Sequence, residues 1–162
     1  MCHVSSIGAG LTGVPMKGAL VSMVVFLHMK DTTSIGTASV GMLLGALLKS
    51  GYKVLVPFGE HKEYDLVLEK NGEFQSVQCK TGEIISEVVK FRTYTVVKKL
   101  GGGYTRRSYN NTVDYYGVYC PGNEQCYLVP ARGTPTSMMN LRLFPPKNSQ
   151  QKKIRWAKDY LL

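Results

Sequence analysis

Acidic residues are scarce in this chain. Its 11 Asp and Glu stand against 20 Lys and Arg, and the net charge is +9. The positive electrostatic field of such a protein disfavours basic partners and favours a polyanionic partner. Among polyanions, nucleic acid is favoured over a membrane surface. At 162 residues the chain is long enough for one domain with a core that needs no disulfides.

Cysteine and histidine are also few, and their spacing excludes a zinc site. The four cysteines form no Cys-x-x-Cys pair, and none of the three histidines stands at a zinc-site spacing. Cys120 and Cys126 flank a short turn and could pair across a hairpin, but free thiols are the simpler interpretation. We therefore expect a reducing compartment, the cytoplasm.

Long apolar runs are missing too. The uncharged run Gly18–Met29 is shorter than the about 20 residues that a membrane span needs, and no Ala-x-Ala site follows it. A weak anchor and an ordered extra helix or strand are alternatives. The leading interpretation of residues 1–29 is a leader or poorly ordered extension upstream of a true start at Met29. The domain would then span residues 30–162, with no membrane partner.

Hydrophobic periodicity and turn residues predict a mixture of helix and strand. Apolar residues recur at helical spacing and stop at Ser50-Gly51, which predicts a helix over 34–49. Asn71-Gly72 predicts the turn of a hairpin over Tyr64–Lys80. A C-terminal helix, or else a basic tail, is expected over 150–162. Segments rich in β-branched and aromatic residues predict further strands over 53–58, 83–99, 113–120, 125–130 and 141–144.

Residues 88–107 are strongly basic, with six Lys or Arg and no Asp or Glu. The run Gly101-Gly102-Gly103 predicts a flexible tip between two extended halves. A basic ribbon of this kind suits a DNA groove or backbone. A solvated edge strand, whose lysines prevent aggregation, is the alternative. The residues expected to contact DNA are Arg92, Lys98, Lys99, Arg106 and Arg107.

Three polar residues of the Tyr64–Lys80 hairpin are expected to meet. Asp65 stands at the head of the first strand. Gln78 and Lys80 share one face of the second strand because side chains alternate along a strand. Since the hairpin brings the start of one strand beside the end of the other, we expect a small metal and phosphate site here.

The order Asp65, then twelve residues, then Gln78-Cys79-Lys80 resembles the PD-(D/E)XK nuclease superfamily, and most closely its group I intron-associated homing endonucleases. The resemblance covers residues 30–162. It implies an α/β, restriction-endonuclease-like fold, with a central mixed β-sheet flanked by helices and an added β-hairpin region. The flanking segments that carry the resemblance are Lys49–Glu60, Val113–Cys120, Tyr127–Pro130, Pro145–Asn148 and Ile154–Ala157.

The resemblance implies a Mg²⁺-dependent endonuclease, with Mn²⁺ as an alternative ion. Its substrate would be double-stranded DNA, its state a dimer or tetramer, and its source a prokaryotic cell or a phage. Asp65, the amide oxygen of Gln78 and the carbonyl of Cys79 would bind the ion, while Lys80 would orient or deprotonate the attacking water. Hard oxygen ligands of this kind suit Mg²⁺.

Two departures from the family pattern concern the metal site. Members commonly carry Glu in the first helix, where the matching residue here is Thr37, and Gln78 stands where an acidic residue is usual. Asp65 is left as the clear acidic ligand, with Glu60 or Glu63 as a candidate substitute. A catalytically weak or inactive DNA-binding relative is therefore the main alternative. A basic structural or interaction domain is the second.

Overall fold

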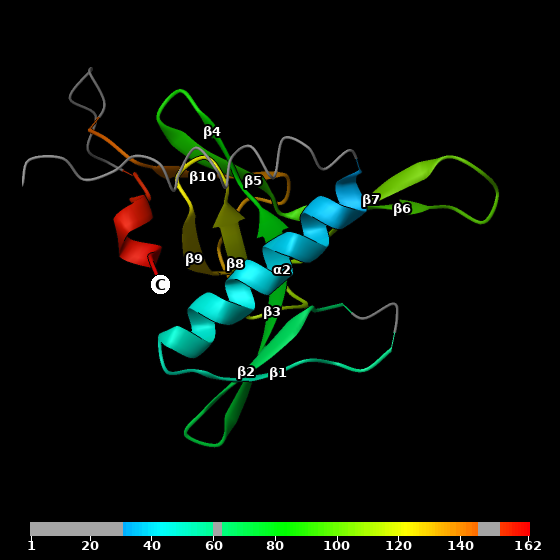
Figure 1. The fold of residues 1–162 in the computed structure, drawn as a ribbon. Coiled ribbons are helices and arrows are strands. Elements are labelled where there is room, and N and C mark those ends of the chain that lie inside the picture. Colours follow the sequence, from blue (N-terminus) through cyan, green and yellow to red (C-terminus); the bar gives the residue numbers. More distant parts are fainter. Residues whose placement is uncertain (1–30, 60–62, 146–152) are drawn as a thin grey trace, which may run out of the picture.

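The computed structural model describes residues 31–59, 63–145 and 153–162. Its centre is a five-stranded mixed sheet crossed on one face by a single long helix (Figure 1). The strand order is β1-β2-β3-β8-β9; β3 and β8 are parallel and the other neighbours antiparallel. The elements are α2 (Thr32–Lys49), β1 (Lys53–Leu55), β2 (Leu66–Lys70), β3 (Glu73–Thr81), β8 (Tyr115–Cys120) and β9 (Gln125–Pro130). The expected α/β class with a central mixed sheet is confirmed.

Helix α2 forms where the periodicity predicts a helix. The Asp31 carboxylate caps its start by accepting a hydrogen bond of 2.6 Å from the Ser34 amide, which satisfies a donor that the first turn leaves free. Gly51, with a φ of +83°, follows its end. Leu43 and Leu47 are fully buried against the sheet, and burying each contributes about 1.5–3 kcal/mol.

The predicted hairpin is formed by β2 and β3. Asn71 and Gly72 have φ values of +56° and +83°, as the tight turn requires. Leu66 pairs with Val77, and the Asp65 amide donates to the Val77 carbonyl at 2.9 Å. This register brings Asp65 opposite the end of β3, as the sequence predicts.

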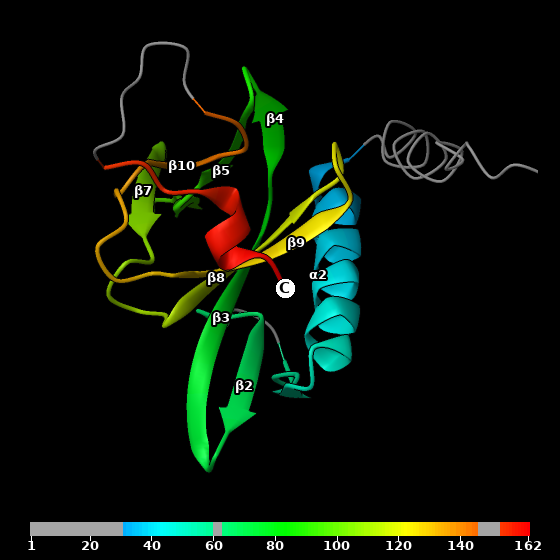
Figure 2. The same ribbon diagram turned by 90° about the vertical axis from the view of Figure 1, so that its left-hand side faces the viewer.

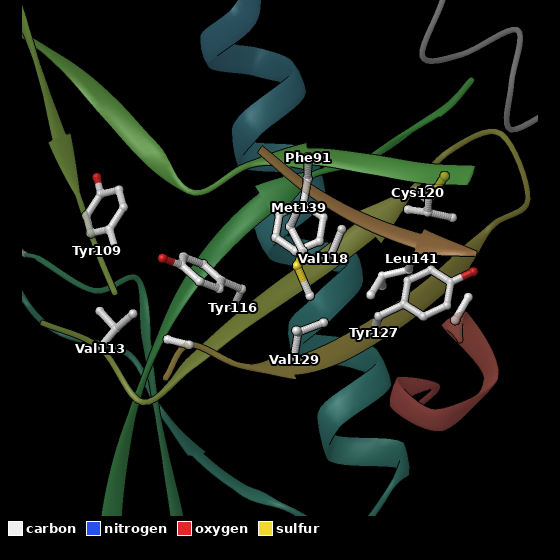
Figure 3. Packing of buried hydrophobic residues seen from close by; sticks show 13 residues of the cluster. Phe91, Tyr109, Val113, Tyr116, Val118, Cys120, Tyr127, Val129, Met139 and Leu141 are labelled. Carbon is white, nitrogen blue, oxygen red and sulfur yellow. The ribbon is translucent and has the colours of Figure 1, made fainter. Parts of the chain in front are cut away.

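The face of the sheet opposite α2 is covered by a second, smaller sheet in the order β10-β5-β4 (Figure 2). Its strands are β4 (Glu83–Ile85), β5 (Val88–Arg92) and β10 (Met138–Arg142). Phe91 and Met139 from this sheet pack with Tyr116, Val118 and Tyr127 of the central sheet (Figure 3). In the described residues, helices therefore flank the sheet less than expected, because the β-branched segment 83–92 forms strands and segment 138–142 pairs with one of them.

A hairpin of β6 (Tyr94–Lys98) and β7 (Tyr104–Ser108) projects from the body of the molecule (Figure 1). Gly102 and Gly103, with φ values of +91° and +78°, form its tip. The added β-hairpin region is thus present in the basic segment where it was expected.

Two expectations about the C-terminal part are wrong. The last strand is Met138–Arg142 and not 141–144, and no α-helix spans 153–162, where only the 3₁₀ turn η1 (Ala157–Tyr160) forms. The tail instead forms backbone hydrogen bonds with β10 and β9. The Arg142 amide donates to the Arg155 carbonyl at 2.8 Å, and the Leu162 amide donates to the Cys126 carbonyl at 3.0 Å. These bonds compete with helix formation. Residues 150–152 lie outside the described residues.

The register of β8 and β9 settles the state of the cysteines. Cys120 pairs with Gln125, whereas Cys126 pairs with Tyr119, so the two thiols point to opposite faces of the sheet. Both are free and buried, as is Cys79. The interpretation as free thiols is confirmed for these three residues.

Residues 1–29, interpreted above as a leader or extension, lie outside the described part of the chain. Within the described part, no helix has the length and apolar character that a membrane crossing requires.

Candidate active site

The structure brings Asp65 and Gln78 into direct contact. Oδ2 of Asp65 accepts a hydrogen bond of 2.5 Å from Nε2 of Gln78 and one of 2.7 Å from the amide of Cys79. Gln78 is buried and Asp65 half-buried. The turn chemistry and strand alternation that predict this meeting act locally, within one hairpin, and so could be read from the sequence.

These groups offer the oxygen ligands that a hard cation needs. Both hydrogen bonds recorded for the Asp65 carboxylate in the described residues fall on Oδ2, which leaves Oδ1 for a cation. The Gln78 amide lies 3.5 Å from the Cys79 carbonyl and presents its oxygen to the same place when turned over. A carboxylate, an amide and a backbone carbonyl suit Mg²⁺ or Mn²⁺.

The thiol of Cys79 is not part of this ligand set. Its side chain packs with the Leu43 cluster under α2, on the opposite face of β3. Burial, aided by the charge of Asp65, raises the pKa of this thiol well above its ordinary value. Cys79 therefore contributes its backbone groups to the site.

Lys80 lies two residues beyond Gln78 on the same face of β3. Burial lowers the pKa of Lys80 to about 8, although the charge of Asp65 acts in the opposite direction. Burial also raises the pKa of Asp65, against the Cys79 amide, the charge of Lys80 and the Gln78 amide. An amine with this pKa can exchange a proton near neutral pH.

Thr37 is not brought to this site. It is exposed, and its hydroxyl donates to the Thr33 carbonyl of its own helix at 3.0 Å. Ser39, only 1% exposed, lies instead on the side of α2 that packs on β3, with Oγ 2.6 Å from Oγ1 of Thr81. Thr37 and Ser39 are two residues apart, which corresponds to a rotation of about 200° around the helix axis, so their side chains project from opposite sides of α2.

Of the two proposed acidic substitutes, the structure describes only Glu63, and it does not place that residue at the site. Glu63 is exposed and pairs with Arg107 at 3.5 Å, and Glu60 lies outside the described residues. Throughout the described ranges, no three Asp, Glu, His or Cys side chains gather where they could hold a metal. Among the described residues, Asp65 is the carboxylate that the structure joins to Gln78 and Cys79, and a cation there would depend on it.

A basic groove of about 720 Å³ begins at Lys80. Lys90 and Arg92 of β5 line it, alternating with the core residues Val89 and Phe91. Lys90 is absent from the DNA-contact set expected from the sequence, although its two-residue spacing from Arg92 is the signal that places both on one face. The other groups that line the groove are Thr32, Thr81, Gly82, Glu83, Phe91, Tyr94, Thr95, Val96 and Met138.

The remaining basic residues of the ribbon do not line this groove and belong to the projecting hairpin. Lys98 and Lys99 stand next to its tip, and Arg106 packs over the Tyr94 ring at 4.8 Å. Arg107 forms its pair with Glu63; because both side chains are half-exposed, that pair is worth only about 0–1 kcal/mol. The structure therefore divides the basic segment into groove and hairpin residues.

Comparison with known proteins places this geometry in a family. The sequence profile described as PD-(D/E)XK endonuclease matches residues 30–162. The bacterial homing endonuclease I-Ssp6803I has a similar fold, with a TM-score of 0.62 and 23% sequence identity over 81% of this chain and 88% of that one. No curated protein matches. Because the profile spans most of the sequence and the fold agrees, the chain belongs to the PD-(D/E)XK endonuclease family.

Proposed function

We propose that this protein is a metal-dependent DNA endonuclease of the homing type that hydrolyses phosphodiester bonds. One observation carries the proposal: the Asp65 carboxylate, held by Gln78 and the Cys79 amide, stands beside Lys80 where a basic groove begins. Endonucleases of this family typically use a divalent metal ion.

The residues divide the reaction between them. Asp65, the Gln78 amide oxygen and the Cys79 carbonyl would hold Mg²⁺, or Mn²⁺ in its place. When bound, such an ion polarises the phosphate and lowers the pKa of an attacking water. Lys80, whose pKa is lowered to about 8, accepts a proton from that water at Nζ when neutral and donates to a phosphate oxygen when charged.

The basic surface positions the DNA. Lys90 and Arg92 line the groove that leads to Lys80, and the projecting hairpin adds Lys98 and Arg106. Contacts of these residues with phosphates fix the register of a duplex. The described residues form one such site, and two chains related by a twofold axis would present a site to each strand of a duplex at once, which supports a dimer or tetramer. The free thiols suit the reducing cytoplasm of a prokaryotic host.

The test is cleavage of supercoiled plasmid by the purified protein with Mg²⁺ or Mn²⁺, and with EDTA as the control. We expect nicked or linear product only with metal. DNA retardation measured at several salt concentrations should show weaker binding as salt rises, because phosphate contacts release counterions. Cleavage that persists in EDTA would contradict the proposal, and a basic structural domain would show no salt-dependent binding at all.

The second candidate is a catalytically weak relative that still binds DNA. Its support is that Asp65 is the carboxylate on which a cation depends, with Thr37 turned away from the site. Such a protein would retard DNA with the same salt dependence and would cut only at high metal concentration, or not at all. A titration of Mg²⁺ and Mn²⁺ against plasmid nicking separates the two.

A further inference from the structure

The ring of Tyr109 lies against the ammonium group of Lys80. Nζ of Lys80 is 4.4 Å from the ring centroid, well inside the range of about 6 Å in which a cation is attracted to an aromatic face. Tyr109 is only 7% exposed and belongs to the core cluster, at whose edge Figure 3 shows it near Val113 and Tyr116. The ring is therefore a fixed surface, and not a mobile surface side chain.

The backbone of Tyr109 is held at the base of the β6–β7 hairpin. Its amide donates to the carbonyl of Thr93, the residue before β6, at 3.2 Å. Its carbonyl accepts from the amides of Thr112 and Val113 at 3.0 and 3.2 Å. The hairpin on one side and the loop leading to β8 on the other thus fix where the ring stands.

A hydrogen-bonded network ties the same hairpin base to the central sheet. The hydroxyl oxygen of Tyr116 lies 3.3 Å from the Thr93 carbonyl and 3.0 Å from Oδ1 of Asn110, and its one proton is shared between these two acceptors. Nδ2 of Asn110 donates to the Thr134 carbonyl at 2.5 Å. Tyr116 is the β8 partner of Gln78 in the parallel pair, so the network joins the hairpin base to the strand beside the site.

We infer that Tyr109 is a positioning residue for the proposed reaction: its ring holds the Lys80 ammonium in place and links that amine to the basic β6–β7 hairpin. A lysine side chain has four rotatable bonds and keeps one arrangement only when something holds it. The inference rests on the proposed function, in which Lys80 acts on the water and the phosphate. It concerns the ring, since the contact is with the aromatic face and not with the hydroxyl.

Two substitutions separate the ring from the hydroxyl. Tyr109→Phe keeps the aromatic face and should cleave within about twofold of the wild type, because the face supplies the attraction. Tyr109→Leu keeps apolar bulk but removes the face, and should lower the single-turnover cleavage rate by about 10- to 100-fold, as expected when a reacting group is misplaced. DNA affinity should stay within about twofold of the wild type in both variants.

Tyr160→Leu is the matched control. Tyr160 packs against the same core cluster and has no recorded cation contact in the described residues, so this variant reports the general effect of losing a half-buried ring. All proteins are compared below their melting temperatures. Equal cleavage by Tyr109→Leu and the wild type, equal losses in Tyr109→Leu and Tyr109→Phe, a matching loss in Tyr160→Leu, or a loss explained by weaker DNA binding would each overturn the inference.

The contact itself can be measured without any cleavage. Protons above an aromatic ring resonate upfield, so the ε-methylene protons of Lys80 should be shifted upfield in the wild type and in Tyr109→Phe. If Tyr109→Leu does not fold, Tyr109→Met serves in its place. An unshifted ε-methylene signal in the wild type would overturn the inference. A wild type that shows the shift but does not cut DNA would instead reject the proposed function.

Discussion

At the scale of single residues, the decisive contact is the one that orients the carboxylate. Asp65 is fixed through Oδ2 by a side-chain amide and a backbone amide, both of which come from β3. When the Gln78 amide turns its oxygen toward a cation, the Cys79 amide still holds Oδ2 in place, so the carboxylate is a preorganised ligand. Lys80, made less basic by burial, stands on the same strand.

Asp65→Ala and Lys80→Ala should each reduce plasmid cleavage by at least about 100-fold, because each removes a group that the chemistry requires. Fold and DNA affinity should be largely unchanged, as circular dichroism and gel retardation can check. Asp114→Ala is the matched control: this carboxylate accepts from the amide and hydroxyl of Ser76 at 2.7 and 2.8 Å and serves structure alone. Cleavage that survives in either site variant would reject the site.

At the scale of elements, helix α2 shows that hydrophobic periodicity can predict where a helix forms without predicting which side of the helix packs on the sheet. Periodicity gives the helix over 34–49, yet the side that meets β3 is set by Ser39, Leu43 and Leu47. Gly36 lies one turn before Ser39 on that side, and Thr32, which lines the groove with Lys80, lies one further turn back. A carboxylate added from α2 should therefore come from this face.

Gly36→Glu should lower the Mg²⁺ concentration needed for half-maximal nicking, because it adds a charged oxygen ligand on the side of α2 that faces the sheet. A Cβ at Gly36 meets nothing within 4 Å, so the side chain has room. Thr37→Glu on the exposed side is the matched control and should leave the metal requirement unchanged. Gly36→Ala reports the gain in helix stability alone, about 1 kcal/mol.

Equal metal titrations for Gly36→Glu and Thr37→Glu would show that α2 supplies no ligand position to this site. A lower requirement with Thr37→Glu alone would instead restore Thr37 as the position that matches the Glu of the family.

The groove and the hairpin tip should differ in what they do for DNA. Replacing both Lys90 and Arg92 by Gln should lower affinity for all sequences, reduce the salt slope by about 1.8, and slow cleavage further, because these residues line the path to Lys80. Replacing Lys98 and Lys99 should reduce the salt slope by a similar amount and leave the single-turnover rate at saturating protein unchanged.

The charge-matched control for both pairs is Lys49→Gln with Lys158→Gln, at the end of α2 and in η1. It lowers the net charge equally and should barely alter the slope. If the control changes the slope as much as the groove pair does, binding depends on total charge and not on the groove.

What the sequence could predict depends on how far apart the interacting residues are. The Asn71-Gly72 turn and the alternation along β3 are local, and they place Asp65 beside Gln78. The pairing of Met139 with Phe91 joins residues distant in the chain and leaves no periodic signal. The contact of Tyr109 with Lys80 is equally non-local. The prediction for the C-terminal segment failed for a related reason. Its apolar residues have helical spacing, but the segment pairs with the edges of strands, and these edges exist only after the rest of the chain has folded.

At the scale of the whole molecule, the family profile begins at residue 30, directly before Asp31, the cap of α2. Deleting residues 1–29 should therefore leave the melting temperature within about 2 °C, which for a domain of this size corresponds to less than about 1 kcal/mol. DNA affinity should also be unchanged. A large fall in melting temperature by calorimetry would show that the deleted residues pack on the core.

The pairing of β3 has a consequence for the order of folding. β2 pairs with β3 only as far as Val77, whereas the run 77–81 pairs with β8, so the catalytic end of β3 has a single partner strand. That partner is reached through a long crossover, and contacts between residues so distant form slowly. The β2–β3 and β6–β7 hairpins close locally and should appear first. In pulsed hydrogen exchange, amides beyond Val77 in β3 should become protected together with β8, so that the chain acquires the strand of the proposed active site after it has formed the basic β6–β7 hairpin.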